Sequence, residues 1–336
     1  MKHTKTLAFA SAALMALGLA GCSTPASAGK VGDMDISSGL YLLMQLNAYN
    51  EAAGLVEDTS ADVLDQTVED MPAADWIAEK TTENIRRYAG IRQLCAEHGV
   101  TLSEDDQTQL DTLVESQWTS YGDYYESNGI GENTFRLALE AELLAEDLLP
   151  AIYGEDGSDP VDAAELESYI QENYTDLAYF SLPLMTPSYT FATEEQQTQI
   201  EELGKKAVQR MQDGEAMETV AAETVKEAYD IMEMEYTEDA AAVQTTTVTK
   251  LGDSVAEAVT AVFETSEGGF GSVTDSTSVV VFRRDALSSP DSLTDSALRY
   301  MKQDDLDQLA LAAADEMGVA LDDSARKALS VKNIKE

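Results

Sequence analysis

The spacing of apolar residues changes along this 336-residue chain, and these changes constrain the fold more than any other feature. Between Asp75 and His98 the apolar side chains recur at helical spacing; they are Ile77, Ile85, Tyr88, Ile91, Leu94 and Cys95. After Tyr174 the period falls to two, which places Ala178, Phe180, Leu182 and Leu184 on one face of a strand. Helical spacing returns in the last forty residues, at Leu306, Leu309, Ala310 and Ala313. We therefore expect an α+β protein that is mainly helical.

Two more long helices are expected in the first half of the chain. Gly99 is suited to end the helix that precedes it, and Ser103 with Asp106 forms a capping box that opens the next. That second helix carries Leu110, Leu113, Val114, Gln117, Trp118 and Tyr121 on one face. A third carries Phe135, Leu139, Leu143, Leu144 and Leu148, and we expect it to end near Pro150.

The middle of the chain alternates strands and helices. Asp162 is expected to cap a short helix, which precedes the strand at Leu177 to Leu184. The elements expected next are a helix at Glu194 to Met211, a strand at Gln244 to Leu251, a helix at Val255 to Phe263 and a strand at Ser278 to Arg284. This strand–helix–strand–helix–strand order predicts a small α+β domain.

The N-terminus has the pattern of a secretory signal. Lys2 and Lys5 precede an apolar stretch that is shorter than the ~20 residues a membrane-spanning helix needs. The run Leu19-Ala20-Gly21-Cys22 resembles the bacterial lipobox. The resemblance implies that residues 1–21 are removed and that Cys22 carries a lipid, followed by a tether over 22–30. We expect an extracytoplasmic protein anchored to the bacterial cell membrane through this lipid.

Charge and cysteine content exclude several kinds of site. The net charge is −42, and the two signal-peptide lysines leave about −44 on the mature chain. So acidic a surface repels nucleic acid, which is therefore not expected as a partner. Cys95 has no disulfide partner if Cys22 is lipidated, and we expect it to be buried. Because no His/Cys cluster could hold zinc, no metal or other cofactor is expected.

Several segments, taken in order, resemble the SurA/PrsA-type extracytoplasmic foldases. Val31 to Ile36 is similar to the opening of their N-terminal domain, and Cys95 to Glu104 resembles the joint between their helices. The short helix at Asp162 to Asn173 resembles the one before their parvulin domain, a peptidyl-prolyl isomerase module. Val255 to Arg284 is similar to the end of that domain.

The resemblance implies a helical chaperone body with a small parvulin-like α+β domain inserted. The N-terminal helical domain would comprise residues 31–160, the parvulin-like domain 174–287, and a C-terminal helix at 292–336 would pack on the N-terminal helices. The partners it implies are unfolded or newly exported polypeptides.

Catalysis is not expected of this parvulin-like domain. Parvulin sites characteristically contain two histidines, one in the first strand and one in the last. Here Ser181 falls at the first position and Val279 or Val280 at the second. The chain has two histidines, of which His3 belongs to the signal and His98 to the helical part. We therefore assign no catalytic residue and expect a binding module.

Aromatic residues of the helical part are the candidate client contacts: Trp76, Trp118, Tyr121, Tyr124 and Tyr125. Residues on an apolar helical face, as Trp118 and Tyr121 are, more often belong to the core. The main alternative is an active peptidyl-prolyl isomerase whose site is rebuilt from Ser, Thr or Tyr. A solute-binding lipoprotein and a metal-dependent hydrolase are further alternatives, but the first half lacks a strand pattern and the acid runs are typical of helix starts and solvated faces.

Overall fold

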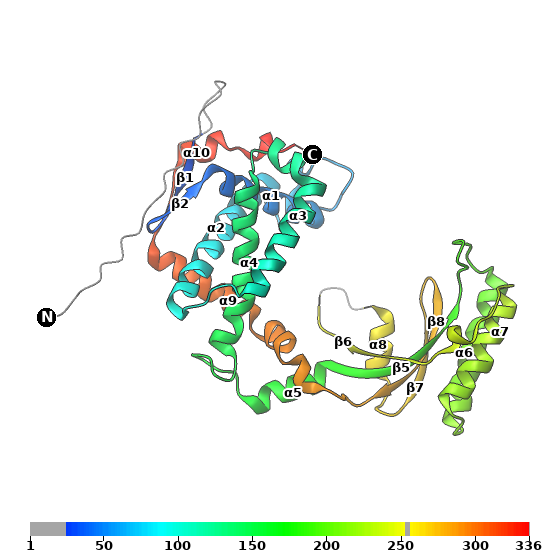
Figure 1. Cartoon of the computed structure of the whole chain (residues 1–336). Helices are drawn as coiled ribbons and strands as arrows, with labels where there is room; N and C mark the ends of the chain where they lie inside the picture. The colour runs from blue at the N-terminus through cyan, green and yellow to red at the C-terminus, as the bar shows by residue number, and fades with distance from the viewer. Residues whose placement is uncertain (1–24, 253–255, 336) are drawn as a thin grey trace. The chain divides into compact units, whose positions relative to one another are not determined.

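A computed structural model describes residues 25–252 and 256–335 (Figure 1). The predicted signal peptide and Cys22 lie outside these ranges. The chain divides into two compact units, one containing residues up to Ala145 and from Asp307 onward, and the other Glu146–Leu306. Helices α4 (Glu132–Tyr153) and α9 (Thr294–Met317) each pass from one unit to the other. The expected fold class is confirmed: a mainly helical body contains both chain ends, and a small α+β unit is inserted between them.

Long helices build the first unit, together with short strands from both ends of the chain. The helices are α1 (Ser38–Leu55), α2 (Ala73–His98), α3 (Glu104–Ser127), the first part of α4, the last part of α9, and α10 (Asp323–Ala328). One sheet has the order β2-β1-β9, with β1 at Ser27–Val31, β2 at Met34–Ser37 and β9 at Val319–Leu321. Strands β3 (Thr67–Val68) and β4 (Met71–Pro72) form a small hairpin. The short 3-10 helices η1 (Val63–Asp65) and η4 (Val331–Asn333) complete the unit.

The predicted tether at 22–30 is too long. Ser27 to Lys30 belong to β1, which pairs antiparallel with both β2 and β9. Strand β9 was not predicted, because the sequence indicated helix for the whole C-terminal segment. A strand this short depends on a partner from the other end of the chain, which local spacing does not reveal.

The predicted helix ends are mostly confirmed. Gly99 takes a left-handed conformation with φ 69° after α2, and the capping box of Ser103 and Asp106 opens α3. The third helix was expected to end near Pro150, and α4 passes through this proline and ends three residues later, at Tyr153. A proline within the last turn removes only one intrahelical hydrogen bond, which the helix tolerates there.

Helices α2 and α9 approach each other closely at Gly90. A Cβ atom built on Gly90 would lie 1.8 Å from the carbonyl oxygen of Ala310 on α9. Two ion pairs flank this contact: Arg86 with Asp315, and Arg87 Nε with Asp307 Oδ1 at 2.7 Å. The C-terminal helix therefore packs backbone to backbone on an N-terminal helix.

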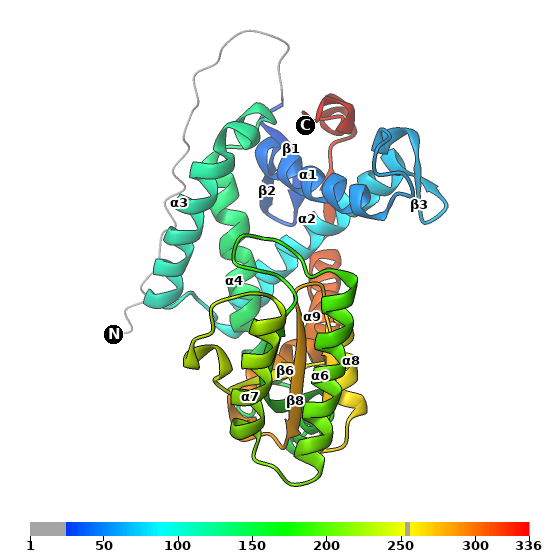
Figure 2. The ribbon, with the colours of Figure 1, turned by 90° about the vertical axis from the view of Figure 1, so that its right-hand side faces the viewer.

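The second unit packs two helices on one face of a four-stranded sheet and one helix on the other (Figure 2). All strands are antiparallel, in the order β6-β5-β8-β7. The elements are α5 (Ala163–Asn173), β5 (Tyr174–Pro183), α6 (Glu194–Gln212), α7 (Met217–Ile231), η2 (Glu238–Ala241), β6 (Gln244–Thr249), α8 (Glu257–Glu264), β7 (Phe270–Thr274), β8 (Ser278–Asp285) and η3 (Pro290–Leu293).

The alternation predicted for the first strand is confirmed. Ala178, Phe180, Leu182 and Leu184 are buried in one core with α6 and α7. On the opposite face Leu177 and Phe282 pack against Val262 of α8. Helix α7 and strand β7 were not predicted; β7 contains Gly271, whose position under the Phe282 ring leaves no room for a side chain.

We expect Gly90→Ala to destabilise the first unit by about 1–3 kcal/mol, because the new methyl group would overpack a backbone contact. Gly54→Ala is the matched control, since it also lies in a helix and has no atom within 4 Å of its added Cβ. Urea unfolding followed by tryptophan fluorescence measures this unit alone, as Trp76 and Trp118 are the only tryptophans in the sequence. An unchanged midpoint for Gly90→Ala would contradict the close contact.

Candidate functional site

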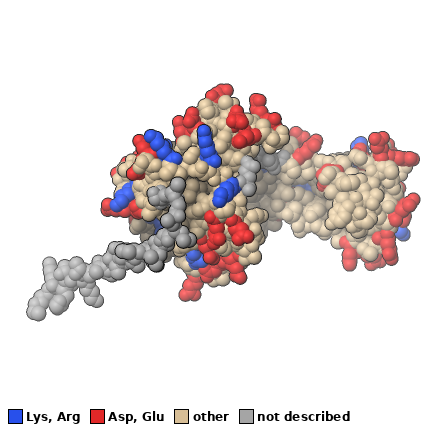
Figure 3. Space-filling view, turned by 90° about the horizontal axis from the view of Figure 1, so that it is seen from above, with Lys and Arg blue, Asp and Glu red and all other residues tan. Residues whose placement is uncertain are grey.

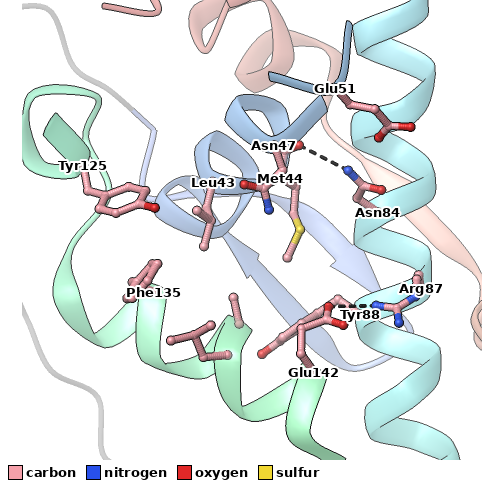
Figure 4. Close-up of a pocket in the computed structure, with 12 residues that line it drawn as sticks. Leu43, Met44, Asn47, Glu51, Asn84, Arg87, Tyr88, Tyr125, Phe135 and Glu142 are labelled. Atoms are coloured by element: carbon pink, nitrogen blue, oxygen red, sulfur yellow. Dashed lines mark hydrogen bonds and ion pairs between the residues drawn. The ribbon is translucent and has the colours of Figure 1, made fainter. Parts of the chain in front are cut away.

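A pocket of about 360 Å³ lies among α1, α2, α3 and α4 of the first unit (Figure 4). Its apolar lining consists of Leu43, Met44, Tyr88, Tyr125, Phe135, Ala138 and Leu139. Its polar lining consists of Asn47, Glu51, Asn84, Arg87 and Glu142. Leu43, Met44 and Phe135 are buried, whereas Asn47, Glu51 and Glu142 are exposed. The pocket therefore combines an apolar interior with a polar rim.

Tyr125 and Phe135 line this pocket and belong to a cluster of aromatic rings. The Tyr125 ring lies 4.8 Å from that of Phe135 and stacks on Trp118 at 5.9 Å, and Tyr124 contacts Tyr125 at 5.8 Å between centroids. Burial raises the pKa of Tyr125, and the neighbouring Tyr124 and Tyr121 raise it further. The phenol therefore stays neutral at ordinary pH and offers a hydroxyl to a ligand.

The rim is organised by Arg87, which comes from the middle of α2. Its Nη1 lies 2.8 Å from Glu142 Oε1 of α4, and its Nε bonds Asp307 of α9. Burial lowers the pKa of Arg87, but Glu142 and Asp307 outweigh that effect and leave the pKa above its ordinary value. Beside it, the Asn84 amide donates to the carbonyl oxygen of Met44 at 3.4 Å. These groups can hydrogen-bond to peptide amides and carbonyls.

The aromatic residues proposed from the sequence separate into two groups. Trp118, Tyr124 and Tyr125 belong to one cluster, and Tyr125 lines the pocket. Tyr121 was predicted to share an apolar face with Trp118, yet it is 58% exposed. Trp76 lies elsewhere in the unit, where it packs beside Ala73 and Ile77 and donates its indole N–H to Glu69 at 3.1 Å.

Sequence reasoning missed most of the pocket lining. The signal was an interruption of the first apolar helical face: Asn47 and Glu51 follow Leu43 at intervals of four residues. On α2, Asn84 and Arg87 likewise lie among apolar positions. A row of polar side chains within an apolar face marks a place where helices leave space between them.

The second unit has a smaller apolar cavity of about 160 Å³, on the sheet face that α8 covers. It is lined by Leu177, Tyr179, Thr246, Val248, Ala258, Val259, Val262, Val273, Val280 and Phe282. Ser181 lies opposite Val280 in the β5–β8 register, so these two residues share this face. Val279 lies opposite Leu182 and is buried in the core on the other face. Of the two valines considered for the second histidine position, Val280 is the one adjacent to Ser181.

Among the described residues no group of three or more His, Cys, Asp or Glu side chains could hold a metal ion. None of the helices described is long and apolar enough to cross a membrane.

The chain is similar to solved structures of the foldase PrsA. Foldase protein PrsA from Streptococcus pneumoniae matches at 14% identity with a TM-score of 0.34, over 82% of this chain and 94% of that one. Foldase protein PrsA from Lactococcus lactis matches at 14% identity with a TM-score of 0.38, over 87% and 96%. The peptidylprolyl isomerase PrsA from Bacillus cereus matches at 12% identity with a TM-score of 0.30, over 80% and 95%. No protein-family model and no curated protein matches the chain.

Arg87→Met should lower the stability of the first unit by about 1–2 kcal/mol, because it breaks two ion pairs and leaves Asp307 partly buried. Arg136→Met is the matched control: its partner Asp111 is 66% exposed, so we expect a loss below about 0.5 kcal/mol. Urea unfolding monitored by tryptophan fluorescence compares the two. If both variants lost the same free energy of unfolding, the ion pairs of Arg87 with α4 and α9 would not contribute measurably to stability.

Proposed function

We propose that this chain is a lipid-anchored extracytoplasmic foldase that binds unfolded, newly exported polypeptides and does not catalyse proline isomerisation. The observation that carries the proposal is the pocket of the first unit. Methionine and aromatic side chains adapt to many apolar partners, and the rim offers hydrogen bonds to any peptide backbone. Such a pocket suits a client that is defined by being unfolded rather than by its sequence.

Anchoring is proposed through a lipid on Cys22. The basis is the lipobox-like run that ends at Cys22 and the short apolar stretch before it. The strong negative charge would keep the body away from anionic headgroups, which leaves the binding surfaces open to clients emerging from the membrane.

The second unit is proposed as a binding module. A parvulin lowers the barrier of ~18–20 kcal/mol to rotation about an X-Pro bond by holding the twisted amide in an apolar pocket beside a polar network. The apolar cavity is present here, but Ser181 and Val280 occupy the two facing strand positions. Serine can donate one hydrogen bond, whereas valine can donate none. A solute-binding lipoprotein is disfavoured, because long helices rather than a second α/β lobe build the first unit.

Client binding is tested by filling the pocket. Ala138 lines it, so Ala138→Trp should reduce the suppression of aggregation of an unfolded model protein at least severalfold. Ala96→Trp is the control, since Ala96 is exposed on α2 and does not line the pocket. The protein from Ser23 onward is used, and light scattering measures aggregation. The same suppression by Ala138→Trp and wild type would exclude this pocket as the client site.

Isomerase activity is tested with the same preparation. We expect it to leave the relaxation of a proline peptide at its uncatalysed rate, which takes tens of seconds. Fluorescence after a solvent jump measures the rate. Clear acceleration that Ser181→Ala abolishes would establish a rebuilt catalytic site at the β5–β8 face and refute the non-catalytic reading.

A further inference from the structure

Strand β6 forms an unprotected edge of the sheet in the second unit. Among the described strands its hydrogen-bonded neighbour is β5, and the register runs without a shift from Thr249 opposite Tyr174 to Gln244 opposite Tyr179. Edge strands are usually protected by lysine, proline or a bulge. The segment from Ala240 to Thr249 has no charged residue and no proline.

The direction of the backbone groups on β6 follows from one hydrogen bond. The N–H of Lys250 donates to the carbonyl oxygen of Asn173, which continues the antiparallel pairing of β6 with β5. Because bonded and non-bonded pairs alternate, Gln244, Thr246 and Val248 point their backbone groups toward β5. The backbone N–H and C=O groups of the alternate residues point away from β5, where an added strand could pair with them. These residues are Thr245, Thr247 and Thr249.

Strand β7, at the opposite edge of the same sheet, is less exposed than β6. All five residues of β7 are half-buried, and this strand contacts both α6 and α8. On β6 the four residues from Gln244 to Thr247 are exposed. Among the described residues, the β6 edge of the sheet is therefore the more exposed of the two.

We propose that β6 binds an extended, β-prone segment of an unfolded polypeptide as an added strand, and that this segment has lysine or arginine beside it. The proposal rests on the proposed foldase function and names a second place where the client is held. Main-chain hydrogen bonds give affinity without demanding a sequence. Val248 and Thr246 line the apolar cavity next to this edge, so alternate side chains of the added strand would lie beside apolar surface.

The negative charge near β6 indicates which kind of polypeptide segment would bind there. Exposed acidic residues lie just before β6, at Glu233, Glu235, Glu238 and Asp239. They favour a basic flank on the bound segment. Acidic side chains outnumber basic ones across the surface in Figure 3, as expected for a chain of net charge −42. A second copy of the chain would be repelled, so a foreign segment fits this edge better than a second β6.

The test uses a peptide of about ten residues, the length of a long strand, with alternating valine and threonine and a lysine pair at each end. Amide hydrogen exchange of the chain from Ser23 onward is measured at single-residue resolution with and without the peptide. We expect the amides of Thr245 and Thr247 to exchange at least about tenfold more slowly with the peptide bound. The amides of Thr246 and Val248, already bonded to β5, should change little. The same peptide with N-methylated central amides should give no protection.

A pair of variants at one position isolates the backbone contribution. Thr247→Pro removes an outward N–H, and proline is tolerated on an edge strand at such a position. Thr247→Val keeps the N–H and removes the hydroxyl that bonds Asp176. We expect the proline variant to bind the peptide at least about tenfold more weakly than the valine variant, measured by fluorescence anisotropy.

Protection confined to the outward amides, together with the difference between the two variants, supports the proposal. Binding without this protection, or equal binding by both variants, would overturn it. Protection that grows with protein concentration in the absence of peptide would identify a second copy as the occupant and also overturn it. These results are independent of the Ala138→Trp aggregation assay, so a failure of the foldase function and a failure of the β6 site can be told apart.

Discussion

The contact between α2 and α9 at Gly90 is the constraint on which the rest of the architecture depends. Two helix backbones can approach this closely only where one of them has no side chain, and Gly90 supplies that position opposite Ala310. The pairing of β1 with β9 ties the two chain ends together a second time. Both the N-terminal and the C-terminal segments belong to the helical unit, so the segment between α4 and α9 begins and ends at that unit. The α+β unit is therefore an insertion.

The same contact shapes the pocket. Arg87 lies one turn before Gly90 on α2, and it reaches Asp307 of α9 on one side and Glu142 of α4 on the other. This three-helix junction holds the charged rim, and the rings of Tyr125 and Phe135, tilted by 37° to each other, line the pocket as well. The pocket therefore lies beside both an ion-pair junction and packed aromatic rings.

Much of the fold could be predicted because it is encoded locally. Helical spacing, the capping box at Ser103 and the alternation along β5 each depend on residues within a few positions of one another. Strand β9 was missed because its partner, β1, is distant in the sequence. Of the residues that line the pocket, the sequence predicted only Tyr125 as a client contact. The other lining residues depend on how four helices pack together, which local spacing does not reveal. Likewise, the sequence left Val279 and Val280 open for the second histidine position, and the strand register shows that Val280 is the one opposite Ser181.

The net charge of the chain lowers the risk that an exposed sheet edge pairs with another copy of the protein. An uncharged edge strand normally invites pairing with another copy, and proteins block this with local features such as a lysine or a proline. Here the repulsion acts at the level of the whole molecule, since two copies of net charge −42 meet a large electrostatic barrier at low ionic strength. Unfolded chains that are neutral or basic meet no such barrier. If β6 binds client segments as proposed, net charge would favour a foreign polypeptide over a second copy of the chain at this edge.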